Sequence, residues 1–184
     1  MQTFLWYNDD IKEKESTHGM IKMEFYRMVR DIVKTDEFLQ MKHYKHHVKG
    51  SVYDHSVKVA YLCYLHHKRF GTKIDLAEFV RGALLHDYYL YDWHDMAPGR
   101  RLHLFTHPKA ALKNATEHYP ELTAVQRDMI RSHMFPITPH TLPKTKAGWL
   151  ICFYDKVAAF SDYFGKNKWK MRERVRIKKT AVPA

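Results

Sequence analysis

Apolar residues recur every three or four positions along most of this chain, and no segment alternates apolar with polar residues over the length of a strand. A spacing of three and four places side chains on one face of an α-helix. In residues 21–35, for example, Phe25, Val29 and Ile32 fall on one such face. The pattern predicts an all-α protein, a helical bundle in which amphipathic helices bury their apolar faces against one another.

Residues that favour helix ends stand where the helical periodicity starts or stops. The candidates whose side chains can accept a hydrogen bond from the free amides of a first turn are Ser51, Asp75, Thr106 and Thr123. Gly71 is expected to end the helix that Ser51 begins, and Pro108 fits the first turn of the helix that Thr106 begins. The other expected segments are helices over residues 21–35 and 145–165 and loops over residues 92–105 and 136–143.

Length and composition indicate one domain, residues 1–184, with a substantial core. The chain is 45% hydrophobic, and its length lies within the usual domain range of about 50 to 250 residues. Cys63 and Cys152 lack the paired spacing of a disulfide framework, and residues 1–15 lack the segments of a signal peptide, so we expect a cytoplasmic protein. The longest apolar run, of about eight residues, is too short to span a membrane, which takes about 20.

An adjacent histidine and aspartate, His86 and Asp87, end the apolar run GALL over residues 82–85. Burying ionisable groups without partners is costly, so buried charges are normally paired or bind a metal ion. His55 lies on the apolar stripe of its expected helix, and Asp155 interrupts the longest apolar segment. Each of these residues, taken singly, also fits an ordinary role, such as a hydrogen-bonded core histidine or a His–Asp pair at a helix end.

Two further histidines, His107 and His133, lie near expected helix ends. Singly, they fit the roles of a polar first-turn residue and of a cation favoured by a helix C-terminus. Together, these ordinary roles require several independent coincidences, whereas ligands from separate helices are how all-α proteins build internal metal sites. A metal ion would offset the cost of burying these groups, and the two oxygens of Asp87 could bridge two ions. We therefore expect a metal centre between the central helices.

The chain has fourteen histidines, and not all of them can be ligands. Six lie beside Lys, Tyr or Glu in polar stretches: His43, His46, His47, His66, His67 and His118. We expect these six on the surface.

The order His55, His86-Asp87, Asp155 resembles that of the HD-domain metal-dependent phosphohydrolases. The segments YDHSVKVAYL, GALLHD and ICFYDKVAAF are similar to the family's first-histidine helix, central motif and final-aspartate helix. The resemblance covers about residues 43–164. It implies an HD-domain helical bundle and an enzyme that hydrolyses a phosphoester, with a nucleotide or related small molecule as the expected substrate.

A subset of the family has two more histidines and two metal ions, and LFTHPKAAL and MIRSHMFP resemble those two positions. The resemblance implies that one ion is held by His55, His86, Asp87 and Asp155. Asp87 would bridge to a second ion, which His107 and His133 would also hold. Ligands rich in histidine suit iron or manganese better than magnesium. We prefer two ions, although one remains an alternative.

The chain also departs from some relatives. Cyclic-dinucleotide phosphodiesterases of the superfamily have a Gly-Tyr-Pro signature, which the segment HMFPITPH lacks. Many relatives have a lysine three residues after the HD aspartate, where this chain has Leu90. Both departures argue against cyclic-dinucleotide hydrolysis and leave phosphate binding to other residues.

Hydrolysis would proceed by attack of a metal-bound hydroxide on phosphorus, and Asp87 is the residue on which this chemistry most depends. Asp92 or His94 could donate the proton to the leaving oxygen or orient another group, or either could be an ordinary polar loop residue. The candidates for binding substrate phosphate are the loop cations Arg100, Arg101 and Lys144, which could equally be solvated.

Most of the net charge of +11 is in a basic C-terminal arm, residues 166–184, which has eight Lys and Arg residues and one acidic residue. Such an arm can bind nucleic acid, although a solvated helix end or an oligomer contact is the commoner case. One alternative function is therefore a metal-holding regulatory or RNA-binding module. A second is a di-iron oxygenase. The oligomeric state and the substrate do not follow from the sequence.

Overall fold

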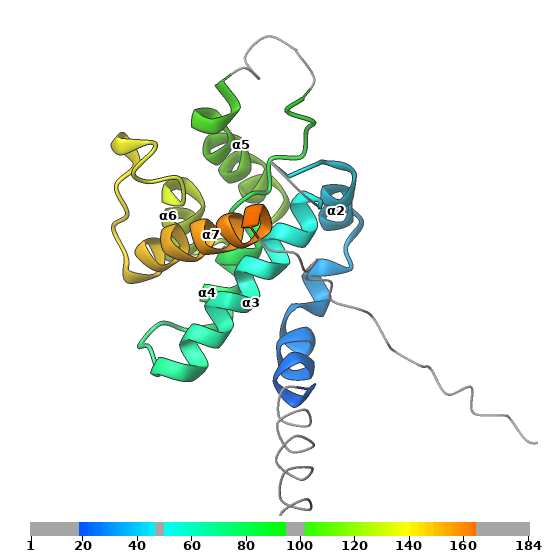
Figure 1. Ribbon diagram of the computed structural model, residues 1–184, viewed down its shortest axis with the longest axis vertical. Coiled ribbons are helices and arrows are strands. Elements are labelled where there is room, and N and C mark those ends of the chain that lie inside the picture. The colour runs from blue at the N-terminus through cyan, green and yellow to red at the C-terminus, as the bar shows by residue number, and fades with distance from the viewer. Residues whose placement is uncertain (1–18, 47–49, 95–101, 165–184) are drawn as a thin grey trace, which may run out of the picture.

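The computed structural model describes residues 19–46, 50–94 and 102–164, and within these ranges the chain is helical and has no β-strand (Figure 1). The all-α prediction is confirmed. After a helix over residues 19–33, the elements are α2 (Asp36–Leu39), the 3-10 turn η1 (Gln40–His43), α3 (Val52–Phe70), α4 (Leu76–Leu85), α5 (His103–His118), α6 (Ala124–Ser132), the 3-10 turn η3 (Pro139–Thr141) and α7 (Lys146–Phe164).

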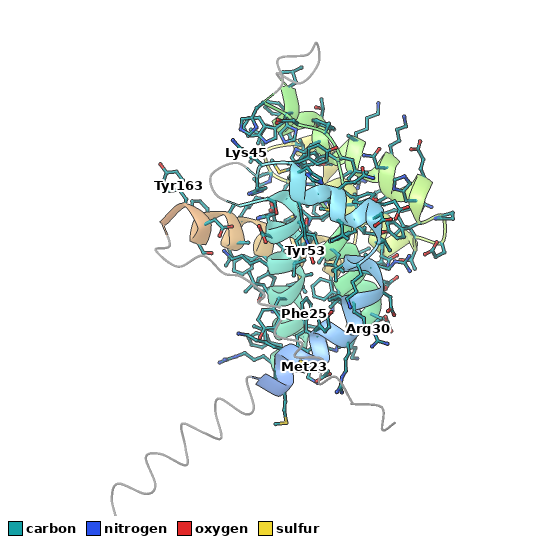
Figure 2. All side chains as sticks on the ribbon, turned by 90° about the vertical axis from the view of Figure 1, so that its right-hand side faces the viewer. Met23, Phe25, Arg30, Lys45, Tyr53 and Tyr163 are labelled. Carbon is teal, nitrogen blue, oxygen red and sulfur yellow. The ribbon has the colours of Figure 1, made fainter. Side chains whose placement is uncertain are left out.

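Helix α3 is the axis of the bundle. It packs against α4 on one side and against α7 on another, and Figure 1 shows α7 crossing α3. Helix α6 contacts α4, α5 and α7, so the helices from α3 to α7 are joined around one core. The helix over residues 19–33 adds to this core through Phe25, whose ring packs against Tyr61 and Tyr64 of α3. Figure 2 shows Phe25 lying over α3, while Met23 points away from the molecule.

Three of the predicted N-caps are observed. Ser51 and Thr123 each form a capping box with the residue three positions later, and the Asp75 side chain accepts a hydrogen bond from the amide of Glu78. Gly71 ends α3 with φ of 57°, in the left-handed region that glycine adopts without strain.

The prediction for the start of α5 is wrong. The helix begins at His103 and not after Thr106, whose hydroxyl donates to the carbonyl of Leu102 and does not cap a first turn. Pro108 therefore lies in the second turn of the helix, where it removes one amide donor. The earlier start also places His103 and His107 one turn apart on one helix face.

The start of α7 is fixed by a buried carboxylate, Asp128 of α6. Asp128 accepts hydrogen bonds from the amides of Lys144 and Thr145 and from the Thr145 hydroxyl. These contacts satisfy donors just before the first turn of α7 and hold α6 and α7 together. Gly148 allows the approach, because a Cβ atom at this position would lie 2.5 Å from Asp128 Oδ2.

Among the described residues, no helix combines the length and the apolar character needed to cross a membrane. Cys63 and Cys152 are both free thiols, and both are buried. Burial raises the pKa of the Cys63 thiol well above its usual range, so this thiol is protonated in the folded protein.

Candidate metal centre

The structure brings the six predicted ligands together in the interior of the bundle, and all six are buried. We call them the His–Asp cluster. They come from α3, the end of α4, α5, the end of α6, and α7, and they are His55, His86, Asp87, His107, His133 and Asp155.

Asp87 is at the centre of the cluster and faces a different histidine pair with each oxygen. Its Oδ1 atom lies 3.2 Å from His107 Nε2 and 3.3 Å from His133 Nε2. Its Oδ2 atom lies 3.6 Å from His86 Nε2 and 3.9 Å from His55 Nε2. One carboxylate therefore joins two groups of nitrogen donors.

Asp155 completes the group that contains His55 and His86. Its Oδ1 atom lies 3.0 Å from His55 Nε2 and 3.6 Å from His86 Nε2. The three ligand atoms lie within 4.8 Å of one another, as do those of Asp87, His107 and His133 in the other group. The cluster thus contains two sets of donors, each compact enough to surround one ion.

Three of the imidazoles are oriented by their own helices. The Nδ1 atom of His86 lies 2.7 Å from the Ala83 carbonyl oxygen, and that of His133 lies 2.8 Å from the carbonyl of Ile130. The Nδ1 atom of His107 lies 2.9 Å from the carbonyl oxygen of His103. A carbonyl can only accept, so Nδ1 carries the hydrogen in each ring. In the neutral imidazole, Nε2 is then a lone-pair donor that faces the cluster, as metal ligation requires.

The Nε2 atoms of His107 and His133 lie only 2.8 Å apart. Both rings use their Nδ1 hydrogen elsewhere, so two neutral imidazoles would have facing lone pairs at this distance. A proton or a metal ion removes the conflict. Two ligands at adjacent corners of an octahedral ion, each about 2.1 Å from it, lie about 3 Å apart. The observed spacing fits two imidazoles on one metal ion.

The acids of the cluster are held ionised. Burial by itself would raise the pKa of Asp87, but the adjacent His86 and the facing His107 and His133 hold it well below its usual range. The pKa of Asp155 is likewise well below its usual range, because His55 and His86 outweigh the effect of burial. Both carboxylates are therefore anionic at neutral pH and available to a cation.

The histidines differ in their electrostatic environment. Burial would lower the pKa of His55, but Asp155, Asp162 and Asp87 raise it to about 9. For His133 the effect of burial prevails and the pKa is lowered, which favours the neutral form that binds a metal. Helices α4 and α6 end immediately before His86 and His133, and the partial negative charge of these two C-termini also favours a cation in the cluster.

A tight turn follows the HD pair and separates the directions of its two side chains. Helix α4 ends at Leu85, His86 is its C-cap, and the amide of Tyr89 donates to the Asp87 carbonyl. Leu90 then adopts φ of 48°, which residues with a side chain rarely do. Because the chain leaves the helix here, the adjacent His86 and Asp87 can both face one centre.

His46 belongs to the same centre, and the prediction that it is a surface residue is wrong. It is buried, its ring stacks on His55 with centroids 3.7 Å apart, and its Nε2 atom lies 3.7 Å from Asp87 Oδ2. His46, His55 and Asp87 also offer ligand atoms within 4.8 Å of one another. His46 is therefore a seventh candidate ligand.

The other histidines expected at the surface differ in their exposure. His43 and His118 are exposed, whereas His66 and His67 are half-buried and bond to Tyr154 and Thr72. His47 lies outside the described residues.

Asp92 and His94 lie in the segment after the turn at Leu90, and both side chains are about half exposed. The Oδ1 atom of Asp92 lies 3.0 Å from His94 Nδ1. The residue between them in the sequence is Trp93. Its ring stacks on His103, which in turn stacks on His107 of the cluster. The rings of Trp93 and His103 thus connect the Asp92–His94 pair to the donor group that contains His107.

The predicted phosphate-binding cations are placed only in part. Lys144 is exposed and lies two residues before the start of α7, and Asp155 lies a further nine residues, about 14 Å, along that helix. Arg100, Arg101 and the basic arm over residues 166–184 lie outside the described residues.

We compared the chain with protein-family models, with curated proteins and with solved structures, and none of the three comparisons gave a match. The geometry of the His–Asp cluster and the motifs that form it are thus the guide to function.

Proposed function

We propose that this protein is a metal-dependent phosphohydrolase of the HD type, which hydrolyses a phosphoester of a nucleotide or a related small molecule. The position of Asp87 is the observation that carries the proposal. Its two oxygens face two different histidine groups, as expected of a carboxylate that bridges two metal ions. In the described part of the chain, the residues of the motif order H, HD, H, H, D come together at one buried place.

The donors fit iron or manganese. His55, His86, Asp87 and Asp155 would hold one ion, and Asp87, His107 and His133 would hold the other, with His46 as a further ligand or neighbour. Nitrogen donors outnumber carboxylates, which suits transition metals better than magnesium or calcium. When bound, two such ions supply a water of lowered pKa as the nucleophile and neutralise the charge of the phosphoryl group.

The protein's own residues have three tasks in this reaction. The cluster residues hold the ligand atoms in place, and the buried surroundings exclude bulk water from most of the centre. Asp92 and His94 form a pair that can hold and deliver a proton, so this pair is our candidate for protonation of the leaving oxygen. The pair is exposed enough to meet a substrate that approaches from solvent.

The test combines metal analysis with an assay on defined substrates. The purified full-length protein should contain close to two transition-metal ions per chain and should hydrolyse nucleotides or a generic phosphoester. Asp87→Ala should lose both properties, whereas Asp31→Asn, a change at a highly exposed carboxylate, should keep them.

Four results would contradict the proposal. A well-folded protein that binds no metal, or hydrolysis that survives Asp87→Ala, would place the chemistry elsewhere. Oxygen consumption by the iron-loaded protein without hydrolysis would favour the oxygenase. Metal binding with neither activity would favour a regulatory module, in which the centre senses a ligand.

A further inference from the structure

Lys156 is a cation at the edge of the His–Asp cluster that the sequence motifs do not identify. It follows Asp155 on α7, and its Nζ atom lies 3.8 Å from Asp155 Oδ2. The same Nζ donates a hydrogen bond to the carbonyl oxygen of His133, at 2.9 Å. Lys156 therefore connects a residue from each of the two donor groups.

The pattern of exposure places Lys156 where solvent reaches the centre. The side chains of the cluster are at most 5% exposed, except for that of Asp155 at 11%. The Lys156 side chain is 31% exposed. Of the six cluster side chains, that of Asp155 is therefore the most exposed to solvent, and the Lys156 ammonium group lies beside it.

Lys156 also has hydrogen-bonding capacity for a ligand. An ammonium group has three donors, and the His133 carbonyl takes one of them. Lys58 of α3 offers a contrast, since its Nζ already donates to the carbonyl of Ala158, the Ser161 hydroxyl and Asp162. Of these two lysines, only Lys156 combines partial exposure, proximity to the cluster and donors to spare.

Charge balance indicates the kind of ligand. In the metal-loaded centre of the proposed function, two divalent ions outweigh the two cluster carboxylates by two positive charges, of which a metal-bound hydroxide would offset one. Lys156 adds one positive charge at the same place. A buried excess of positive charge is costly unless an anion compensates it, and the phosphoryl group of a monoester carries up to two negative charges.

We propose that Lys156 forms a phosphate-binding subsite, in which its ammonium group binds a non-bridging oxygen of the substrate's phosphoryl group beside Asp155. This inference rests on the proposed function for its metal ions. This chain has Leu90 where many HD-domain relatives have a lysine after the HD motif. Lys156 of α7 would take over phosphate binding in place of that lysine.

Binding of inorganic phosphate to the manganese-loaded, full-length protein tests the inference by calorimetry, with no need for turnover. Lys156→Gln should weaken phosphate binding at least tenfold while the metal content stays unchanged. Lys156→Arg, which keeps the charge, should retain most of the affinity. Lys113→Gln is the matched control, because Lys113 is exposed on α5 and pairs only with Glu117 among its described contacts.

An unchanged phosphate affinity in Lys156→Gln would overturn the inference, and so would loss of bound metal, which would show a structural role. Equal weakening by Lys156→Arg and Lys156→Gln would show that charge is not the cause and would also overturn it. Binding of phosphate through Lys156 without hydrolysis of any phosphoester would contradict the proposed function and leave this inference standing. In an active protein, Lys156→Gln should raise KM more than it lowers kcat.

Discussion

The Nε2 atoms of His107 and His133 face each other at 2.8 Å, although each ring already donates its Nδ1 hydrogen to a backbone carbonyl. Two unshared lone pairs at this distance repel each other, and a proton or a metal ion between the rings removes the repulsion. A bound metal ion would replace it with two coordinate bonds, so we expect metal binding to stabilise the folded state.

Removal of the metal should therefore lower the thermal stability of the protein. A ligand present at about 1,000 times its Kd stabilises the folded state by about 4 kcal/mol, and each kcal/mol shifts the Tm of a chain of this size by about 2–4 °C. We expect the Tm to fall by roughly 8–16 °C when a chelator strips the ions. Calorimetry before and after chelation, with manganese added back, measures the effect. Identical melting curves would contradict a metal centre.

Loss of one histidine from the second donor group should remove one ion and leave the other. His133→Gln keeps a side chain of similar polarity but removes a ligand from the group that Asp87 and His107 complete. We expect the metal content to fall from two ions to one per chain, and hydrolysis to be lost. His140→Gln, at an exposed position on η3, is the control. A variant that still holds two ions would show that His133 is not a ligand.

His46→Ala tests the ligand that the motifs do not include. Its stacking on His55 and its distance from Asp87 predict a role in binding or orienting the metal, and such neighbours typically contribute 10–100-fold to metal affinity. We expect weaker metal binding by about that factor in a competition assay with a chelating indicator. His43→Ala changes an exposed histidine of the same segment and should have no effect.

The metal-free and metal-loaded forms should respond to pH in opposite ways. The pKa of His55 rises from 6.5 to about 9 on folding, so the charged form stabilises the metal-free protein fully below pH 6.5, and this contribution is lost as the pH rises through 9. Metal binding needs the neutral imidazole and strengthens over the same interval. The difference in Tm between the two forms should therefore widen from pH 6.5 to pH 9. A narrowing difference would contradict the assignment of His55.

Gly148→Ala should destabilise the bundle at the junction of α6 and α7. The new Cβ atom would meet Asp128 Oδ2 at 2.5 Å and push the carboxylate away from the Lys144 and Thr145 amides, which donate hydrogen bonds to it. Overpacking of this kind costs about 1–3 kcal/mol, which denaturant unfolding can measure. Gly19→Ala is the control, because its Cβ atom would meet no atom within 4 Å. Equal stability of the two variants would mean that Asp128 relaxes freely.

Much of the fold could be predicted because helices leave local signals. The caps Ser51, Asp75 and Thr123 act through hydrogen bonds to residues three positions later, so the sequence contains both partners. Thr106 and Pro108 carry the same local signal but do not start a helix. His103 and His107 of this helix are buried, and burial against distant segments is not visible in the local sequence.

The candidate site was predictable to the extent that its residues interrupt apolar patterns. His55, His86, Asp87 and Asp155 lie where burial of a polar side chain needs a reason, so each can be recognised from its neighbours in the sequence. His46 lies between Lys45 and His47, and its burial arises from the chain folding back, with its amide donating to the Gly50 carbonyl just before α3.

Lys156 could not be recognised from its neighbours either. Its place at the cluster depends on the end of α6 meeting the middle of α7, where the His133 carbonyl accepts from its Nζ atom. Contacts of this kind between distant segments leave no trace in local periodicity.

The contacts of His86, His107 and His133 with carbonyls three or four residues earlier have a consequence for assembly. The Nδ1 side of each ring is fixed by a turn of the ring's own helix. Once α4, α5 and α6 have formed, three of the donors already point the right way, and docking has only to bring them within range. Little rotamer entropy then remains to be lost when an ion arrives, which makes the centre preorganised.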